Sequence, residues 1–371
     1  MQFSEERGKI TFSGAENHLF VLLDNLCRLG IDTELIAIVT CNGPAIDQKL
    51  SSLRDKGITV TIVNAPESGI IHKILFPNVP WFIGLWKTLI SRRNRLIHIH
   101  LNPVYMVLAA QLARCPYIFF SLHNDDPAFI RLKWRLWFRF INSSITHYIA
   151  ITKWVKEYHV STLGIAPDKI SVIYYGLELA QPRKSRNQLR EQFGIPLDAY
   201  VVGFIGRLTE QKNVPLFIEA VSRIPDIKGI IVGGGELEQA LKAMVRKSNI
   251  TNVLFLGPHH NADELMEMFD IFCLPSIFEG LGLVLIEAML SKVPVIGSRA
   301  GAIPEILGNG SYGALFNSND PADLIRALRE MRNNQSYDND FVLKAYKHAT
   351  EAFSIDAMMK RTIEVYRKEL H

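Results

Sequence analysis

Residues 275–289 of the chain read PSIFEGLGLVLIEAM, and they hold two glutamates, Glu279 and Glu287, on either side of a glycine-rich turn. The apolar run of residues 270–275 ends in a proline and predicts a short buried strand, whereas residues 283–291 have the composition of a helix. Glu279 therefore falls in a strand-to-helix loop, and Glu287 falls about one turn inside the helix.

The glycine-rich turn suits a polar ligand that carries hydroxyl and anionic groups. Gly280 and Gly282 let the backbone approach a ligand closely, and the amides that open a helix are unpaired donors with partial positive charge. A carboxylate such as that of Glu279 or Glu287 can accept two vicinal hydroxyls at once. From this fragment alone a second interpretation is equally good, namely two solvated glutamates and a glycine that caps a helix.

The stretch resembles the signature of the retaining nucleotide-sugar glycosyltransferases of group 1 (family 4, the Glu-x7-Glu type), which include bacterial mannosyl-, glucosyl- and N-acetylglucosaminyltransferases. The commonest form is E-G-F-G-L-V-x-x-E-A, and only Leu281 departs from it, in place of the aromatic residue. The resemblance implies that Glu279 contacts hydroxyls of the donor sugar and that Glu287 binds the ribose. It also implies that backbone amides from Gly280 to Leu283 contact the sugar and the phosphate of the donor. A hydrolase would instead need two carboxylates flanking one bond at about 5 to 9 Å, and the helix start between the glutamates makes donor binding more natural.

Length and composition favour a globular protein of two domains. The 371 residues are 48% hydrophobic and 21% charged, which is enough to build sizeable cores and unlike a disordered chain. Cys27, Cys41, Cys115 and Cys273 lack metal-ligand spacing and predict buried thiols in a reducing compartment. No apolar run approaches the ~18 to 20 residues of a membrane span, and no signal peptide opens the chain. We therefore expect a cytoplasmic protein, bound at most peripherally to the inner face of the cytoplasmic membrane.

The basic excess is concentrated in the middle of the first half. Residues 68–160 hold 12 Lys and Arg against 3 Asp and Glu, which suggests an acidic partner. Residues 76–95 and 130–141 interleave basic residues with Trp and Phe, as in amphipathic helices that lie on anionic membrane surfaces. The alternative is a pair of core-facing helices with solvated basic residues. Nucleic acid is not expected as a partner, since no binding motif accompanies the charge.

Strands and helices alternate through the first half. The predicted strands are residues 33–39, 58–63, 96–101, 117–122, 145–151 and 170–174. This alternation predicts a parallel sheet wound on both faces, in which ligands gather at the carboxyl ends of the strands. His123 follows the fourth strand and is predicted to point to that edge; in the family that the chain resembles, a histidine here touches the transferred sugar. The alternative is a histidine satisfied within a loop, and no role is assigned to Asn124, Asp125 or Asp126.

The beginning of the chain departs from the family pattern. A helix is predicted over residues 16–28. The turn before it, S-G-A-E, resembles the family's G-G-A-E turn with Ser13 in place of the first glycine, and through Gly14 this turn would bring backbone amides near the donor. The strand expected ahead of the turn is nearly missing, because residues 9–12 are few and residues 1–8 are polar. Either the natural start lies upstream or the first strand is reduced; a frayed terminus before an ordinary amphipathic helix is the alternative.

A second polar loop follows the apolar strand predicted at residues 200–205. Its sequence, GRLTEQKN, places Arg207 and Lys212 after Gly206, and two cations in one loop can hold a pyrophosphate and stabilise its charge as it leaves. The pattern resembles the family's G-R-L and Lys-Gly, whose Arg and Lys bind the donor diphosphate. Asn213 occupies the position of the usual glycine, and asparagine also tolerates a positive φ. The alternative is two solvated surface charges.

Two further turns complete the predicted donor site. Residues 228–232 predict a strand that ends in GGGEL, which resembles the family's V-G-x-G turn, where Gly234 lets the nucleotide lie against the backbone. Because this turn does not complete G-x-G-x-x-G, it argues against a nicotinamide dehydrogenase. Pro258, after the next predicted strand, should border the base pocket. His259 and His260 face apart and no carboxylate or thiol motif completes a metal site, so we favour an ordinary loop there.

The resemblance implies the GT-B fold, an α/β fold with two Rossmann-like domains facing across a cleft. Residues 1–178 and the C-terminal helix, residues 355–371, would form the acceptor-side domain, and residues 179–354 would bind the nucleotide sugar. At the first boundary YYGLE resembles the family's Y-N-G-hydrophobic-Asp, with Tyr175 in place of Asn and Glu178 in place of Asp. The implied reaction moves a sugar, with retention, from a nucleotide-diphosphate sugar to a hydroxyl of a cell-envelope glycan or lipid-linked saccharide.

Four residues form the expected catalytic set. Arg207 and Lys212, helped by helix amides, would neutralise the diphosphate, so that no cofactor or metal is expected. His123 and Glu279 would contact the sugar. Three alternatives stay open. A GT-B-fold nucleotide-sugar epimerase would turn over the donor without an acceptor, and a non-catalytic membrane-associated partner subunit would suit the reduced first strand and Tyr175. A pure membrane adaptor would bind anionic vesicles and no nucleotide.

Overall fold

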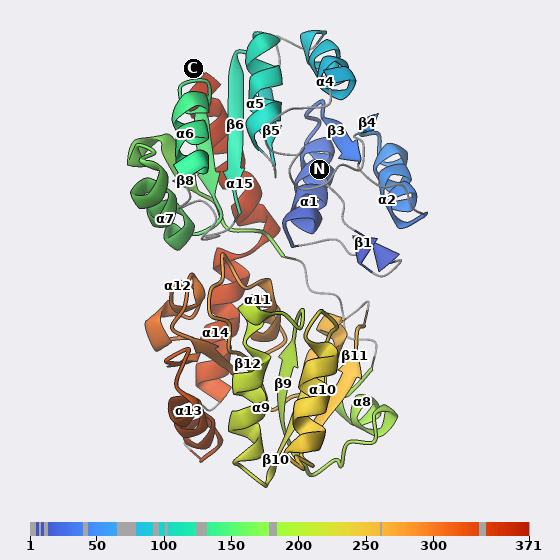
Figure 1. Cartoon of the computed structure of the whole chain (residues 1–371), viewed down its shortest axis with the longest axis vertical. Coiled ribbons are helices and arrows are strands. Elements are labelled where there is room, and N and C mark those ends of the chain that lie inside the picture. The colour runs from blue at the N-terminus through green and yellow to red at the C-terminus, as the bar shows by residue number, and fades with distance from the viewer. Residues whose placement is uncertain are drawn as a thin grey trace. The chain divides into compact units, whose positions relative to one another are not determined.

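In the computed structural model the chain divides into two compact units, Met1–Gly176 with Ile355–His371, and Leu177–Ser354 (Figure 1). The structure describes residues 5–6, 9–10, 14–39, 44–64, 79–91, 96–100, 103–123, 132–177, 184–259, 262–333 and 339–370. The chain passes between the units where Leu177 and Ser354 form an isolated bridge. Within the described residues, no helix has the length and apolar character needed to cross a membrane.

The second unit is built on a six-stranded sheet in which every pair of neighbours is parallel. Its strands are β9 (Tyr200–Ile205), β10 (Ile227–Val232), β11 (Val253–Gly257), β12 (Ile271–Leu274), β13 (Val295–Ser298) and β14 (Ala314–Phe316). They lie in the order β11-β10-β9-β12-β13-β14, which is the 3-2-1-4-5-6 order of dinucleotide-binding folds. The winding reverses between β9 and β12, and ligands in such sheets bind outside the carboxyl ends of the strands at that reversal.

Helices cover this sheet, which is why its strands are largely apolar. Phe204 in β9 and Phe272 in β12 are fully buried. Helix α9 (Val214–Ser222) contacts β10 and β11, α11 (Leu283–Leu290) contacts β12 and β13, and α12 (Ile303–Ile306) contacts β13. The other helical segments of this unit are α8 (Arg186–Gln192), η3 (Glu210–Lys212), α10 (Glu238–Lys247), η4 (Ala262–Met268), η5 (Gly308–Gly310), α13 (Pro321–Asn333) and α14 (Asn339–Ala352).

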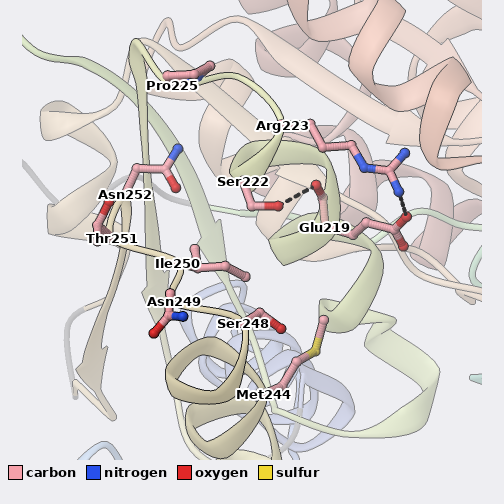
Figure 2. A pocket seen from close by; sticks show the side chains of 10 residues that line it. All are labelled: Glu219, Ser222, Arg223, Pro225, Met244, Ser248, Asn249, Ile250, Thr251 and Asn252. Carbon is pink, nitrogen blue, oxygen red and sulfur yellow. Dashed lines mark hydrogen bonds and ion pairs between the residues drawn. The ribbon is translucent and has the colours of Figure 1, made fainter.

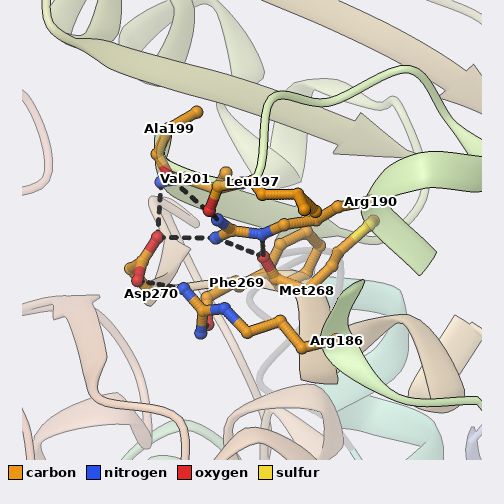
Figure 3. A network of polar contacts seen from close by, with 8 residues as sticks. All are labelled: Arg186, Arg190, Leu197, Ala199, Val201, Met268, Phe269 and Asp270. Atoms are coloured by element: carbon orange, nitrogen blue, oxygen red, sulfur yellow. Dashed lines mark hydrogen bonds and ion pairs between the residues drawn. The ribbon is translucent and has the colours of Figure 1, made fainter. Parts of the chain in front are cut away.

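A partly buried ionic network joins α8 to the amino ends of β9 and β12 (Figure 3). The Arg190 guanidinium donates to the carbonyl oxygen of Met268 and, at 2.8 Å, to the Asp270 carboxylate, and only 1% of the arginine side chain is exposed. Asp270 also accepts from the Val201 amide at 2.7 Å and from Arg186. Since each charge has both an ionic and a hydrogen-bonding partner, the network can be buried without leaving an unpaired group.

Within the described part of the first unit, the parallel strands lie in two sheets. Among the described residues, β3 (Glu34–Val39) pairs with β4 (Thr59–Asn64), while β5 (Leu96–Ile99), β6 (Tyr117–Leu122), β7 (His147–Ala150) and β8 (Ile170–Val172) form a four-stranded sheet in that order. The sequence predicted one sheet here. The polar opening of the chain instead forms a short antiparallel pair, β1 (Glu5–Glu6) with β2 (Lys9–Ile10), because it lacks the apolar residues of a buried central strand.

Helices of the first unit include the C-terminal one. They are α1 (Gly14–Arg28), α2 (Pro44–Asp55), α4 (Val79–Ile90), α5 (Pro103–Leu112), α6 (Leu132–Ile141), α7 (Lys153–Leu163), the short η2 (Pro167–Lys169) and α15 (Ile355–Leu370). Met358 and Met359 of α15 share a core cluster with Leu22 and Leu26 of α1 and with Ile149 of β7. The last helix therefore closes the core of the first unit.

Candidate active site

The loop after β9 carries two basic residues at the point where the winding of the second sheet reverses. Arg207 is exposed and has no acidic partner among the described residues. The stem of Lys212 lies against Gly206, at the end of β9. Asn213 then adopts a left-handed conformation (φ 49°, ψ 42°) that ends η3 and begins α9, so the positive φ that the sequence allowed at this position is confirmed.

Lys212 pairs with Glu279, which lies in the loop after β12. The Nζ–Oε2 distance is 2.5 Å, and each side chain is 12% exposed. Ser276 Oγ donates to the same carboxylate oxygen at 3.2 Å. No described residue donates to Glu279 Oε1, so one oxygen is fixed and the other is left for a further donor.

Backbone contacts hold the two loops together. The Ile277 amide donates to the Gln211 carbonyl at 2.8 Å, and Gln211 Nε2 donates to the Phe278 carbonyl at 3.1 Å. The Ala302 amide, in the turn after β13, donates to the Glu279 carbonyl at 2.8 Å. Three strand-to-helix loops therefore form one rigid edge around the Lys212–Glu279 pair, which is the kind of support that a preorganised site requires.

Two glycines in these loops occupy places that no other residue would fill without strain. Gly282 starts α11 in the left-handed region (φ 75°, ψ 55°), a conformation that costs other residues free energy. At Gly233 (φ 134°) a Cβ atom would lie 1.9 Å from the Gly206 carbonyl oxygen. The turns after β9 and β10 can therefore approach each other this closely only with glycine at position 233.

Gly234 and Pro258, both predicted to border the nucleotide, are neighbours. A Cβ atom at Gly234 would lie 3.8 Å from the proline ring, and the Gly234 carbonyl accepts from the Leu208 amide at 2.9 Å. His259 Nδ1 lies 3.2 Å from the Gly257 carbonyl oxygen, as in the predicted ordinary loop. The turns after β9, β10 and β11 therefore adjoin at the same sheet edge.

Glu287 lies one turn inside α11, where the sequence placed it. Burial raises the pKa of its carboxyl group to about 7, and the negative charge of Asp263 adds to this effect. A carboxylate held in a water-poor environment binds hydroxyl donors more strongly than an exposed one. With a pKa of about 7 the Glu287 carboxyl group is a mixture of protonated and ionised forms at neutral pH, and hydrogen bonds donated by the hydroxyl groups of a ligand would favour the ionised form.

In the first unit, His123 follows β6 directly and is half-buried. Its Nδ1 atom is hydrogen-bonded to the Tyr175 hydroxyl, and its Nε2 atom is shielded from solvent without a hydrogen-bond partner among the described residues. Burial lowers the pKa of His123 to about 3, so the imidazole is neutral. The ring of His18, from α1, stacks on Tyr175 with 3.6 Å between ring centroids.

The structure divides the predicted site residues between the two units. The second unit contains Gly206, Arg207, Lys212, Gly234, Pro258, Glu279, Gly280, Leu281, Gly282, Leu283 and Glu287, and the first contains Gly14, where α1 begins, and His123. Asn124, Asp125, Asp126, Glu178 and His260 lie outside the described residues, as do the side chains of Trp134 and Trp137.

Three residues that contact the predicted site residues or their loops were not predicted from the sequence. Ser276 and Gln211 fix the Glu279 loop, and Tyr175 was noted only as a departure from a family motif. Ser276 lies three positions before Glu279, so its proximity could have been inferred from the loop. The contacts of Gln211 and Tyr175 join residues 67 and 52 positions away, and no local pattern indicates them.

A surface depression of about 530 Å³ lies elsewhere on the second unit (Figure 2). It is lined by the ends of α9 and α10 and by residues 249–252, and Arg223 pairs with Glu219 at its side with an N–O distance of 2.6 Å. These segments precede β10 and β11, so they border the amino ends of the strands. The depression contains none of the predicted site residues. Among the residues that the structure describes, no group of three or more His, Cys, Asp and Glu side chains could hold a metal ion.

The solved structures of similar fold include a protein in complex with UDP and glucose and a glycosyltransferase. HepE from Anabaena, in complex with UDP and glucose, matches with a TM-score of 0.78 and 20% identity over 99% of both chains. WaaG, a glycosyltransferase involved in lipopolysaccharide biosynthesis, matches with a TM-score of 0.72 and 14% identity over 96% of both chains. Together with the two sets of parallel strands, these likenesses define the chain as a protein with the two-domain Rossmann-like GT-B fold.

Sequence relatives lead to the same class. An uncharacterized glycosyltransferase of Methanocaldococcus jannaschii is 27% identical over 59% of both chains. The alpha-maltose-1-phosphate synthase of Mycolicibacterium smegmatis is 28% identical over 55% of this chain and 58% of its own length. The UDP-Gal:alpha-D-GlcNAc-diphosphoundecaprenol alpha-1,3-galactosyltransferase of Escherichia coli is 29% identical over 68% of this chain and 70% of its own. The chain thus aligns with somewhat more than half of the length of the first two.

Two family models cover most of the chain. The model described as Glycosyltransferase Family 4 matches residues 12–181, and the model described as Glycosyl transferases group 1 matches residues 185–348. The chain belongs to the group 1 glycosyltransferases. The family to which the Glu279–Glu287 motif was assigned by resemblance is therefore confirmed.

Proposed function

We propose that the chain transfers a sugar from a nucleotide-diphosphate sugar to a hydroxyl group of a cell-envelope glycan or lipid-linked saccharide, with retention of the anomeric configuration. The observation that carries the proposal is the contact of Lys212 with Glu279 at the point of reversed winding. It brings a cation suited to phosphate and a carboxylate suited to sugar hydroxyls to one place. Retention is supported by the match of the Glu279–Glu287 spacing to the retaining signature.

Arg207 and Lys212 are the groups proposed to act on the diphosphate. When the bond between the anomeric carbon and the diphosphate oxygen breaks, negative charge builds up on the leaving oxygen. The exposed Arg207 guanidinium has no acidic partner among the described residues, so it is free to bind phosphate oxygens in pairs. The amides at the start of α11 add partial positive charge, because they lie at the amino end of a helix. Stabilising that charge lowers the barrier to departure.

Glu279 is proposed to hold the sugar. Lys212 and Ser276 both bind Oε2, so the carboxylate is fixed in orientation while Oε1 is available to accept a hydroxyl of the donor sugar. The Glu279 carboxylate partly neutralises the charge of Lys212. The lysine can therefore lie beside the diphosphate without pulling the diphosphate away from the reacting position. Glu287 is proposed to accept the two ribose hydroxyls.

We propose that the reaction requires no metal ion, because Arg207, Lys212 and the amides of α11 supply positive charge where a divalent cation would otherwise act. Turnover should then be unchanged after exhaustive treatment with a chelator and dialysis. Loss of activity that is restored by added Mg²⁺ or Mn²⁺ would contradict this part of the proposal.

We also propose a peripheral position at the inner face of the cytoplasmic membrane. On α6, Leu136 and Phe140 are about 60% exposed, and Arg139 is exposed beside them. Apolar and basic side chains on one exposed surface favour an anionic lipid interface. The Escherichia coli relative is named for a diphosphoundecaprenol-linked acceptor, and an acceptor of this kind would lie at the same interface.

The transfer reaction is tested with purified protein and a panel of UDP-, GDP- and ADP-sugars, with and without a lipid extract of bacterial envelopes. We expect release of nucleoside diphosphate that depends on the extract. An epimerase would convert the donor to its isomer in the absence of any acceptor. A non-catalytic partner subunit would neither release nor isomerise the donor, and either result would replace the proposed function.

A further inference from the structure

Tyr175 connects three elements of the first unit through two different contacts. Its side chain is 3% exposed, and its ring stacks on His18 of α1 at an interplanar angle of 12°. Its hydroxyl group is hydrogen-bonded to Nδ1 of His123, at the end of β6. Tyr175 itself lies just after β8. The tyrosine is therefore positioned to control the orientation and protonation of His123.

A count of protons decides which partner donates. Burial raises the pKa of the Tyr175 hydroxyl well above its usual range and lowers that of His123, so both groups are neutral and each has one N–H or O–H proton. If His123 Nδ1–H donated to the tyrosine oxygen, the tyrosine proton and the bare Nε2 atom would both lack a partner among the described residues. If the tyrosine donates to Nδ1, only the Nε2–H group lacks a hydrogen-bond partner among the described residues. The second arrangement leaves fewer unsatisfied buried groups and is favoured.

The neighbouring His98, in the same sheet, is a histidine with a hydrogen-bond partner on each ring nitrogen. Its Nδ1 atom also has a tyrosine partner, Tyr366, at 2.6 Å, but its Nε2 atom is satisfied by Ser121 Oγ at 2.8 Å. His123 has the same kind of tyrosine contact and no second partner among the described residues. Since a buried N–H without a partner costs free energy, the open nitrogen of His123 indicates a group that a ligand completes.

We infer that Tyr175 is a positioning residue that holds His123 in the tautomer with its proton on Nε2, so that the histidine presents a neutral N–H donor to a substrate oxygen. This inference rests on the proposed function for the identity of that substrate, a sugar with hydroxyl oxygens. The neutral donor suits a hydroxyl or ring oxygen, and it takes no part in proton transfer.

The tautomer can be read directly by two-bond ¹H–¹⁵N correlation spectra of the ¹⁵N-histidine-labelled protein, with the His123→Gln variant to assign the signal. In the wild type we expect His123 to be protonated on Nε2. Tyr175→Phe keeps the ring that stacks on His18 and removes only the hydroxyl, so the signal should move to a mixture of tautomers or to the Nδ1–H form. An Nδ1–H tautomer in the wild type, or an unchanged tautomer in Tyr175→Phe, would overturn the inference.

Tyr366→Phe is the matched control, because it removes the hydroxyl from the other buried tyrosine–histidine pair. It should leave the His123 signal and turnover unchanged. Tyr175→Phe should lower kcat by about tenfold or more and change the donor KM by less than about threefold. A shifted tautomer with unchanged kcat would refute the role in the reaction. If the wild type transfers no sugar but has the expected tautomer, the proposed function fails while the pairing of Tyr175 with His123 stands.

Discussion

Glu287 is the residue at which the electrostatics of the second unit can be measured most simply. Its carboxyl group has a pKa raised to about 7 by burial and by Asp263, above the value of an unfolded chain. The folded protein therefore binds this proton more tightly than the unfolded chain does. Below pH ~4.5 the group is protonated in both states and has no effect on stability, whereas the free energy of unfolding falls as pH rises from there through 7.

Glu287→Gln should therefore stabilise the ligand-free protein at pH 8, by on the order of 3 kcal/mol, and have little effect at pH 4.5. Urea unfolding of both proteins at the two pH values measures this difference. Glu330→Gln, in a helix where the carboxylate is half exposed, should leave the pH dependence unchanged. An equal effect of Glu287→Gln at both pH values would show that its carboxyl group is not destabilised by burial.

Individual residues were predictable from the sequence only where a local motif contained them. Glu279, Lys212 and His123 were selected by their places after apolar strands and by resemblance to a family. That Lys212 and Glu279 would pair could not be predicted, because the contact joins two loops 67 positions apart. The same is true of the Tyr175 hydroxyl, whose partner is set by how β6 and β8 lie in the sheet.

At the scale of elements, the strands predicted at residues 200–205, 228–232 and 270–275 agree within one residue at each end with β9, β10 and β12, because each is a largely apolar run bounded by turns. β9 was predicted at residues 200–205 and is found there. The order of these strands, which places the two polar loops at the reversal of winding, is a property of the tertiary structure. In the first unit the pattern predicted parallel strands, and the described strands pair in parallel. Among the described residues, β3 and β4 pair with each other and not with the other four strands, which the residue pattern could not show.

The network around Asp270 should hold α8, β9 and β12 in place. Asp270→Asn leaves the buried Arg190 guanidinium without its counter-charge, and we expect a loss of about 3 to 5 kcal/mol in the free energy of unfolding. Equilibrium urea unfolding measures it. Asp226→Asn removes the partner of Arg332 from a pair in which the aspartate is 68% exposed, and this control should have a much smaller effect. Similar losses in the two variants would mean that the network around Asp270 contributes no more to the free energy of unfolding than a surface ion pair does.

At the scale of the whole molecule, the exposed surface of α6 should decide membrane binding. The double variant Leu136→Ser and Phe140→Ser should float less with vesicles that contain phosphatidylglycerol, since two apolar contacts are lost. Binding of the wild type should weaken in high salt. The control replaces Leu197 and Leu343, exposed leucines of the second unit, with serine. Equal flotation of the α6 variant and the wild type would exclude this surface as the membrane contact.

The donor site is tested most directly by calorimetric titration with nucleoside diphosphates, using the wild type, Arg207→Ala and Glu279→Gln. We predict that the wild type binds at least one nucleoside diphosphate and that Arg207→Ala weakens this binding by about tenfold or more. Glu279→Gln should bind within about threefold of the wild type, because Lys212 remains, while its turnover falls by about 100-fold. A wild type that binds no nucleotide, or an Arg207→Ala variant with unchanged affinity, would contradict a donor site built from these residues.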